Sequence, residues 1–405
     1  MIETFDIAVP PATTDSGRIC PACSKGEMRV FYDVARAPTN SCILWMTPDE
    51  AKEARTGQVK LGFCDRCGFI CNTTFRPEIV EYSSRYEETQ GFSGTFNKFH
   101  KALAERLIAK HNLRGKTVLE IGCGKGDFLM LLSELGGNTG IGVDPSAHPE
   151  RLNGEAAGRV TLIPDFYSER YSERDVDFVA CKMTLEHIIE PFEFVAKIRR
   201  GLAHQPQSVV FFQIPEALRI LRTCAFEDIY YEHCSYFTPG SIARLFVAAG
   251  FRPLDLSIDY DDQYLTIEAR PNSEDLLPEI SHTDMDELRD LVDKFPARME
   301  AKMRVWRERL ESWRKKDKRV VIWGSGSKAV SFLTSFGATG TIEHVVDINP
   351  YRQGAFIPVT AQPIIAPKEL QTVKPDIVIL MNSIYEGEVR QSLTELGLAP
   401  EIYPL

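Results

Sequence analysis

Four cysteines near the start of the sequence have the spacing of metal ligands. Cys20 and Cys23 enclose Pro-Ala, and Cys64 and Cys67 enclose Asp-Arg about forty residues further along the chain. A CxxC turn directs two thiolates toward one point, and two such turns complete the tetrahedral sulfur site that suits Zn²⁺. Because sulfur fills all four positions, we expect a structural zinc site rather than a catalytic one.

Two further cysteines lie in the same region. Cys71 is separated from Cys67 by three residues and ranks below the four paired cysteines as a ligand. Cys42 lies in an apolar run and is expected to be buried. The alternative to a metal site is a set of structural thiols that bind no metal. A single CxxC pair would leave this alternative open, whereas two pairs disfavour it.

A glycine-rich turn provides the second chemical signal. The run VLEIGCGKGDF places an expected strand before the turn and an expected helix after it, and it contains Glu120, Gly122, Gly124 and Gly126. Glycines let a bulky ligand lie against the backbone. Asp144, at the end of the next expected strand, can accept hydrogen bonds from both hydroxyls of a ribose, so we expect a nucleotide cofactor. Glu120 would repel a pyrophosphate but could bind a cationic amino group.

The run from Phe226 to Phe237 is dense in acid–base groups. His233 titrates near neutral pH without assistance, Glu232 precedes it, and Tyr230 could donate a hydrogen bond to a developing oxyanion. His187 follows another expected strand, at the strand end that faces the ligand crevice in an open α/β sheet. A lone histidine is usually a surface or filler residue, whereas two histidines in these positions favour acid–base catalysis.

The elements that must hold these residues indicate an α/β fold. Five short β-rich runs alternate with helical segments, at 117–122, 138–144, 160–164, 177–182 and 208–215. This alternation predicts a parallel sheet with helices on both faces, preceded by an amphipathic helix over 96–112. We divide the chain into a zinc-binding module (1–80), a nucleotide-cofactor domain (81–282), a helical connector (283–317) and a C-terminal Rossmann-like domain (318–405).

Two details of the later units are testable. Pro296 is expected to kink or break the connector. The C-terminal unit has room for a sheet of three or four strands, and its loop Gly324-Ser-Gly326-Ser-Lys-Ala matches G-x-G-x-x-A, with Asp347 after the next strand. A loop of this kind is a weak signal, so we favour a Rossmann-like domain that covers the active site and could bind a substrate phosphate over a true NAD site.

Bulk composition narrows the class of partner. The formal net charge of -10 argues against nucleic-acid binding. The sequence contains neither an apolar run long enough to span a bilayer nor a signal-peptide pattern at its N-terminus, so we expect a cytoplasmic protein. The expected partner is a small-molecule substrate, and the expected state is a monomer or a weak homodimer.

The glycine-rich turn resembles motif I of the class I methyltransferases. This resemblance implies that the loop faces the methionine part of S-adenosylmethionine and that Asp144 holds the ribose. It also implies that Asp165 and Phe166, after the third strand, flank the adenine.

The run FEDIYYEHCSYF resembles the F-D-x-I-Y-H-E-H-x-S-Y-F signature of the sugar C-methyltransferases, which act on nucleotide-linked keto-deoxysugars. The resemblance extends over the zinc module, the class I methyltransferase domain and the Rossmann-like C-terminal domain. It implies that His233 is the base, that Glu232, Tyr230 and His187 assist it, and that Tyr86 lines the site. Tyr231 replaces a histidine of the signature, and the segment 260–264 (YDDQY) replaces the family's H-G-G-S-x-R, so the substrate is less certain than the chemistry.

Three functions therefore compete. The first is a C-methyltransferase in which His233 removes a proton next to a ketone and the enolate carbon takes the methyl group. The second is an O- or N-methyltransferase that uses the same base on a hydroxyl or an amine. The third is a non-enzymatic assembly protein with a vestigial cofactor site, which the intact set of Glu120, Gly122, Gly124 and Asp144 disfavours.

Overall fold

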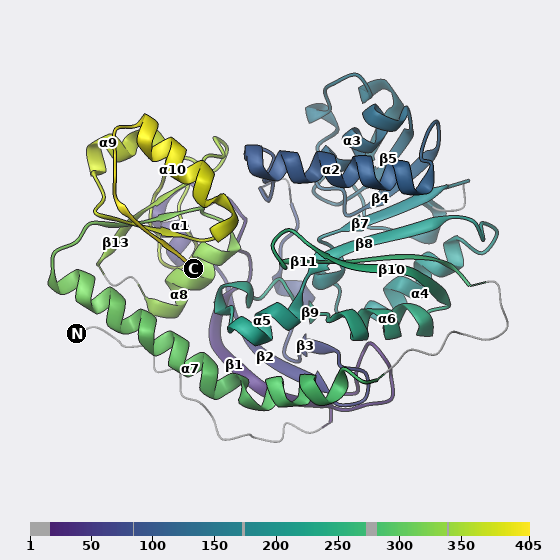
Figure 1. Ribbon diagram of the computed structural model, residues 1–405, viewed down its shortest axis with the longest axis horizontal. Helices are drawn as coiled ribbons and strands as arrows, with labels where there is room; N and C mark the ends of the chain where they lie inside the picture. Colours follow the sequence, from purple (N-terminus) through teal and green to yellow (C-terminus); the bar gives the residue numbers. More distant parts are fainter. Residues whose placement is uncertain (1–16, 84, 172–174, 273–281, 338–339) are drawn as a thin grey trace.

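The computed structural model describes residues 17–83, 85–171, 175–272, 282–337 and 340–405. Its strands form three sheets, of four, seven and five strands (Figure 1). Residues 1–16 and 273–281, at the start of the predicted zinc module and the end of the predicted methyltransferase domain, lie outside the described residues. The division into four units by residue number stays a prediction.

The seven-stranded sheet has the order β10-β11-β8-β7-β4-β5-β6. All five predicted strands are present as β4 (Thr117–Ile121), β5 (Thr139–Val143), β6 (Val160–Ile163), β7 (Phe178–Lys182) and β8 (Val209–Pro215). They pair in parallel, as expected. Two further strands that were not predicted extend the sheet in the antiparallel direction, because β11 (Tyr264–Pro271) pairs antiparallel with β8 and with β10 (Phe251–Asp259).

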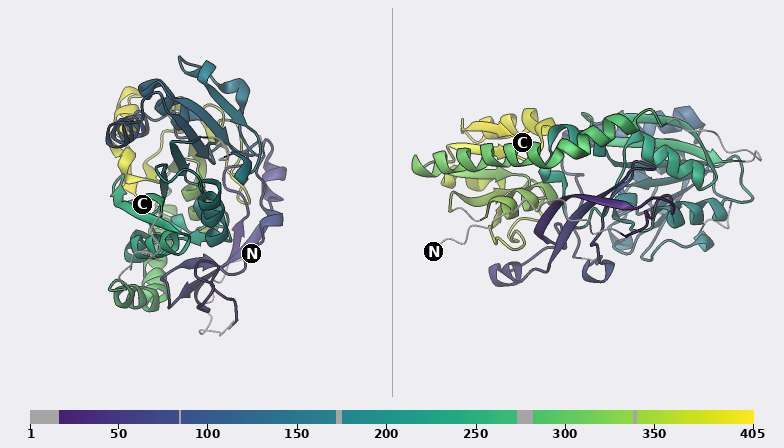
Figure 2. Two further views of the ribbon diagram at one scale, coloured as in Figure 1. Left: turned by 90° about the vertical axis from the view of Figure 1, so that its right-hand side faces the viewer. Right: turned by 90° about the horizontal axis from the view of Figure 1, so that it is seen from below.

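Helices cover both faces of this sheet, because alternate residues of each buried strand point to opposite sides. Val118 and Phe178 face one side and pack beneath α2 (Gly94–His111) and α3 (Asp127–Gly136). Leu119 and Val179 face the other side and pack against α4 (Pro191–Gly201) and α6 (Pro239–Ala248). The two helical layers can be followed in Figure 1 and, from other directions, in Figure 2. The helix predicted over 96–112 is α2.

The N-terminal sheet includes a strand from far along the chain. Its order is β1-β2-β3-β9, where β1 (Met28–Pro38), β2 (Thr56–Cys64) and β3 (Ile70–Asn72) come from the predicted zinc module. The fourth strand, β9 (Ser235–Tyr236), pairs antiparallel with β3 and begins two residues after His233. A short helix, α1 (Pro48–Lys52), connects β1 to β2.

The C-terminal sheet is fully parallel, with the order β14-β13-β12-β15-β16. Three strands were expected, β12 (Val320–Trp323), β13 (Ile342–Val346) and β15 (Ile377–Leu380). The predicted limit of four strands is wrong, because the two-residue β14 (Ile364–Ile365) and the terminal β16 (Glu401–Pro404) bring the total to five. Its helices are α8 (Ser327–Phe336), α9 (Leu370–Val373) and α10 (Glu386–Glu395).

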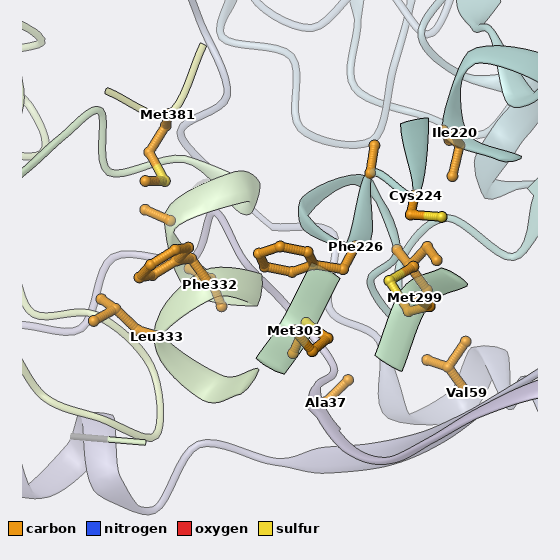
Figure 3. Close-up of a cluster of buried hydrophobic side chains, with 14 of the residues drawn as sticks. Ala37, Val59, Ile220, Cys224, Phe226, Met299, Met303, Phe332, Leu333 and Met381 are labelled. Carbon is orange, nitrogen blue, oxygen red and sulfur yellow. The ribbon is translucent and has the colours of Figure 1, made fainter. Parts of the chain in front are cut away.

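One long helix, α7 (Met285–Lys315), connects the units. The connector is helical as predicted, but Pro296 lies inside the helix and does not break it. Met299 and Met303 of α7 lie in one buried cluster with Val59 of β2 and Phe332 of α8 (Figure 3). The same cluster includes α5 (Ala217–Thr223), so a single apolar core joins the N-terminal sheet, the helix and the C-terminal domain.

Among the described residues, the search for a membrane-spanning segment finds no helix with the required length and apolar character.

Candidate active site

A cavity of about 1300 Å³ lies where the three units meet. Its walls include the glycine-rich loop after β4, the histidines His187 and His233, and the C-terminal loop Gly324–Lys328. Ligand pockets for one small molecule usually measure about 300–1000 Å³. The cavity is therefore large enough for a nucleotide-sized cofactor together with a second small molecule.

The glycine-rich loop has the open backbone that the sequence predicted. Gly122 and Gly124 both have positive φ, at 70° and 52°. A Cβ atom on Gly122 would lie 1.9 Å from Oγ1 of Thr184, and one on Gly124 would lie 2.6 Å from Oε1 of Glu88. Both glycines line the cavity, so a side chain at either position would occupy space that a cofactor needs. Gly126 instead turns toward Leu162, 3.1 Å from its Cβ position.

Asp144 and Glu120 are both in the cavity wall, as predicted for cofactor-binding acids. The Asp144 carboxylate accepts hydrogen bonds from the backbone N–H of Gly124 (3.0 Å) and of Ser146 (2.7 Å). Glu120 is 3% exposed, and its Oε2 has no hydrogen-bond partner among the described residues. Burial raises the pKa of Glu120 to about 8, against the opposing attraction of the Lys182 ammonium.

Two residues beside the loop were missed by the sequence analysis. The carboxyl group of Glu88 lies over Gly124, and burial raises its pKa to about 7. Lys125 donates hydrogen bonds from Nζ to the backbone carbonyls of Tyr86 (3.0 Å) and Ser146 (3.1 Å). Glu88 lies in a loop with no secondary-structure pattern in the sequence. The one sequence signal for a role in the site was its place beside a second acid, Glu87.

The predicted adenine-flanking residues differ in their positions. Phe166 lines the cavity and is 67% exposed, which leaves its ring available to a ligand. The Asp165 carboxylate accepts hydrogen bonds from the backbone N–H of Phe166 (2.8 Å) and the hydroxyl of Tyr171 (2.5 Å), and it also pairs with Arg170.

The predicted acid–base residues come together at the opposite wall. The Tyr230 hydroxyl is hydrogen-bonded to Nε2 of His233 at 2.8 Å, and the rings of His187 and His233 meet edge to face at 4.9 Å. Tyr82, which the sequence analysis missed, is hydrogen-bonded through its hydroxyl to Nδ1 of His187 at 3.0 Å. Burial lowers the pKa of His233 well below its usual value and that of His187 to about 4, so both rings are neutral at neutral pH.

Glu232 was expected to assist His233 directly, but its side chain is bound to other residues. Its buried carboxylate accepts hydrogen bonds from the backbone N–H of Ser41 (2.8 Å) and the side-chain amide of Asn40 (3.2 Å). Tyr86 also stabilises the carboxylate, although burial is the largest effect and raises the pKa of Glu232. Glu232 therefore attaches the catalytic segment to the N-terminal unit, and Tyr86 reaches it from the cavity wall.

A further carboxylate, Glu186, lies close to both histidines and was not predicted. Its Oε1 is 3.9 Å from Nε2 of His233, and the side chain is 2% exposed. Burial raises the pKa of Glu186 to about 8. The sequence signal was its position immediately before His187, after a predicted strand.

The N-terminal unit holds residues 230–237 from outside the seven-stranded sheet. Cys71 of β3 pairs with Ser235 of β9, and the backbone N–H of Asn72 donates to the carbonyl of Cys234 at 2.9 Å. Tyr231, which replaces a histidine of the family signature, is buried and accepts a hydrogen bond through its hydroxyl from the backbone N–H of Arg76 (2.9 Å). This residue therefore packs in the N-terminal unit rather than in the cavity wall.

The four predicted cysteine ligands are gathered at one point, with all four sulfur atoms within 4.8 Å of one another. The Sγ atoms of Cys20 and Cys67 are 3.6 Å apart, and those of Cys23 and Cys64 are 3.8 Å apart. Four sulfurs at about 2.3 Å from a tetrahedral Zn²⁺ are about 3.8 Å from one another. The geometry fits zinc. Cys71 lies outside this group, and Cys42 is buried, as expected, at the wall of the large cavity.

The segment 260–264, which departs from the family pattern, contacts the C-terminal domain. The Tyr260 hydroxyl donates to that of Tyr385 at 2.8 Å. The side-chain amides of Gln263 and Asn382 exchange two hydrogen bonds, at 3.0 and 2.8 Å. The substituted residues therefore bridge two domains across the rim of the cavity.

The C-terminal glycine loop also reaches the cavity. Asp347, the residue in the position of a ribose-binding acid, accepts hydrogen bonds from the backbone N–H (2.8 Å) and the hydroxyl (2.5 Å) of Ser325. Lys328, in the first turn of α8, pairs with Asp228 at 3.2 Å. The loop thus lines the cavity, and its acid is bound within the loop itself.

Comparison with known proteins identifies two domains in the chain. Residues 95–256 match a family described as "Methyltransferase domain", and residues 267–398 match one described as "C-methyltransferase C-terminal domain". The chain is 25% identical to the C-methyltransferase NovU of Streptomyces niveus over 345 residues, which cover 80% of each protein.

More distant similarities are confined to part of the chain. A ubiquinone biosynthesis O-methyltransferase of Actinobacillus pleuropneumoniae serotype 7 is 30% identical over 135 residues, 30% of this chain and 56% of that protein. A crystal structure of magnesium protoporphyrin IX methyltransferase from Synechocystis, with bound S-adenosylhomocysteine, is similar over 44% of this chain and 84% of that one, at 18% identity and a TM-score of 0.33.

Proposed function

Because this chain is an S-adenosylmethionine-dependent methyltransferase whose residues 267–398 match a C-methyltransferase C-terminal domain, we propose that it methylates a carbon next to a ketone. The observation that carries this proposal is the shared cavity, whose walls hold both the glycine-rich loop and the pair of Tyr230 and His233. A base and a cofactor site that face one space can act on one substrate.

The cofactor site suits a cation. Glu88, Glu120 and Asp144 lie around two glycines whose Cβ positions are blocked, and the buried Oε2 atoms of Glu88 and Glu120 have no hydrogen-bond partner among the described residues. S-adenosylmethionine carries a sulfonium and an ammonium group and, when bound, supplies an electrophilic methyl group. We propose that Asp144 holds its ribose, that Glu120 holds its amino group and that Phe166 contacts its adenine, with Asp165 positioning that segment.

The proposed chemistry begins with a proton. The substrate's α-carbon loses a proton to neutral His233, and the C–H electron pair passes into an enolate. Tyr230 or His187 stabilises the enolate oxygen by a hydrogen bond. The enolate carbon is then the nucleophile that accepts the methyl group, and the proton stays on His233 until it is released to solvent. Glu232 acts as a positioning residue through Asn40 and Ser41.

For the substrate, we propose a keto sugar, which could be linked to a nucleotide. The similarity to NovU along most of the chain and the resemblance of residues 226–237 to the sugar C-methyltransferase signature support this class. The segment 260–264, whose Tyr260 and Gln263 contact the C-terminal domain, replaces the H-G-G-S-x-R segment of that family, so this chain's preference among such sugars should differ.

One Zn²⁺ bound by Cys20, Cys23, Cys64 and Cys67 completes the proposal. The sulfur–sulfur distances and the closed set of four thiols support a structural ion. Its proposed task is to fix the loop between β2 and β3, and with it the β3 partner of β9.

The second candidate is an O-methyltransferase, which the partial similarity to a ubiquinone biosynthesis O-methyltransferase favours. The same His233 could deprotonate a hydroxyl group. We set aside the assembly-protein hypothesis because both matched domains are methyltransferase domains.

Mass spectrometry and NMR of the product separate the two candidates. The enzyme is incubated with a panel of keto sugars, free and nucleotide-linked, and a methyl donor labelled with ¹³C. We expect a new carbon–carbon bond to the labelled methyl group. In deuterated water with a non-transferring cofactor analogue, the substrate's α-proton should exchange. A labelled methyl group on oxygen, without α-proton exchange, would contradict the enolate mechanism.

A further inference from the structure

Glu186, His187 and His233 together have the donor set of a metal centre. One ligand atom from each lies within 4.8 Å of the other two, and all three residues line the large cavity. Oε1 of Glu186 lies 3.9 Å from Nε2 of His233. Two imidazoles and one carboxylate on one side of an open space leave coordination positions free for water or substrate.

The carboxylate is the independent observation that points to a cation. Neither oxygen of Glu186 has a hydrogen-bond partner on another described residue, although the side chain is 2% exposed. Among the described residues, its one ion-pair contact is with the imidazole of His233, at 3.9 Å, which carries charge only when it is protonated. A buried carboxylate normally has a charged or hydrogen-bonding partner, because burial without one is costly.

The surroundings of His187 resemble the outer sphere of a metal ligand. His187, like a ligating histidine, has a polar partner at one ring nitrogen, and such partners commonly fix the tautomer. Its Nδ1 is within 3.0 Å of the Tyr82 hydroxyl, and Nε2 of His233 is within 2.8 Å of the Tyr230 hydroxyl. An ion bound at Nε2 of His233 would take the place of the Tyr230 hydrogen bond, and the Tyr230 hydroxyl could then bind water or substrate on the ion.

We propose that Glu186, His187 and His233 form a binding site for one divalent transition-metal ion, separate from the four-cysteine site. Imidazole and carboxylate donors suit ions such as Mn²⁺, Fe²⁺ and Zn²⁺, whereas the four thiolates select zinc. The ion takes the nitrogen lone pair that His233 needs as a base. If His233 is the base, as the proposed function holds, then the ion competes with the substrate's proton and inhibits the enzyme.

Titration with Mn²⁺ tests the site on the full chain with its cysteine-bound metal retained. Electron paramagnetic resonance reports free Mn²⁺, so bound ion appears as lost signal. We expect one tight equivalent in the wild-type protein. Glu186→Gln and, separately, His187→Gln should weaken binding by at least the roughly 10- to 100-fold that loss of an outer-sphere partner costs. Glu190→Gln is the matched control, because Glu190 is an exposed carboxylate in the same cavity wall.

Thermal unfolding and S-adenosylmethionine binding are measured for each variant to check that it folds. If Glu186→Gln does not fold, His187→Gln serves as the test, and the reverse also holds. Absence of tight Mn²⁺ binding to the wild type, or equal binding by both ligand variants, would overturn the site. Methyl transfer is measured as the site fills. A falling rate supports the site and the inhibition. A rate that rises with Mn²⁺ supports the site but overturns His233 as the base, so the two proposals fail separately.

Discussion

The two walls of the cavity are built in different ways. The cofactor wall, formed by residues 120–126 and 144, comes from two adjacent strands and the loop between β4 and α3. The acid–base wall, formed by Tyr82, His187, Tyr230 and His233, depends on contacts over long distances in sequence. Glu232 binds Asn40 across 192 positions, and Tyr82 meets His187 across 105.

This difference separates binding from chemistry. The Asp144 carboxylate holds Gly124 within one supersecondary unit, so the cofactor wall can form whenever the central sheet folds. The segment that carries His233 is held instead by the N-terminal sheet through β9 and by the loop at residues 40–41. Damage to the N-terminal unit should therefore reduce catalysis and spare cofactor binding.

The largest expected effect is at the acid–base wall. His233→Asn keeps a polar side chain but removes the proposed proton acceptor, so kcat should fall by roughly 10²- to 10⁴-fold. Calorimetry should show almost unchanged affinity for S-adenosylmethionine. Tyr230→Phe, which loses one hydrogen bond and keeps the base, should cost less. If the His233→Asn enzyme kept the wild-type rate, another group would have to be the base.

The next effect is at the cofactor wall. Asp144→Ala removes the carboxylate that holds Gly124 and is proposed to bind the ribose. Affinity should fall by roughly 1.5–3 kcal/mol, or about 10- to 150-fold in Kd. Isothermal titration measures this loss directly. If the affinity for S-adenosylmethionine were unchanged in this variant, the cofactor would have to bind at another site.

The smallest effect concerns Glu88, whose pKa of about 7 reflects its burial over Gly124. The carboxyl group is neutral below this pKa and negative above it, and a negative charge attracts a cationic cofactor. Affinity should therefore increase, by less than about tenfold, as pH rises through about 7. Calorimetry at several pH values checks the slope. Glu88→Gln should remove that part of the pH dependence, and an identical slope in the variant would show that another group titrates.

The sequence predicted the cofactor wall better than the acid–base wall for a physical reason. Glycines, an acid and strand patterns lie close together in sequence, so Gly122, Gly124 and Asp144 could be assigned from local pattern alone. His233 and Tyr230 were found because they share one dense run. Tyr82, Glu88 and the true orientation of Glu232 depend on long-range packing that no local pattern encodes.

The fold shows the same limit. The regular buried strands and α2 were predicted, whereas β9, β14 and β16 are short and obtain their stability from neighbouring strands. Pro296 was expected to kink or break α7, but the helix continues through it and is anchored on both sides by buried residues such as Val292 and Met299. Tertiary packing there outweighs the loss of one helical hydrogen bond.

The most direct test of the central claim is to disrupt the cysteine site and measure binding and rate in the same preparation. Cys64→Ser removes one of the four gathered thiols while leaving the central sheet unaltered. We predict that the Kd for S-adenosylmethionine stays within about twofold of the wild-type value, while the methyl-transfer rate falls about 10- to 100-fold because the base is misplaced. Equal loss of affinity and rate, or an unchanged rate, would contradict the separate construction of the two walls.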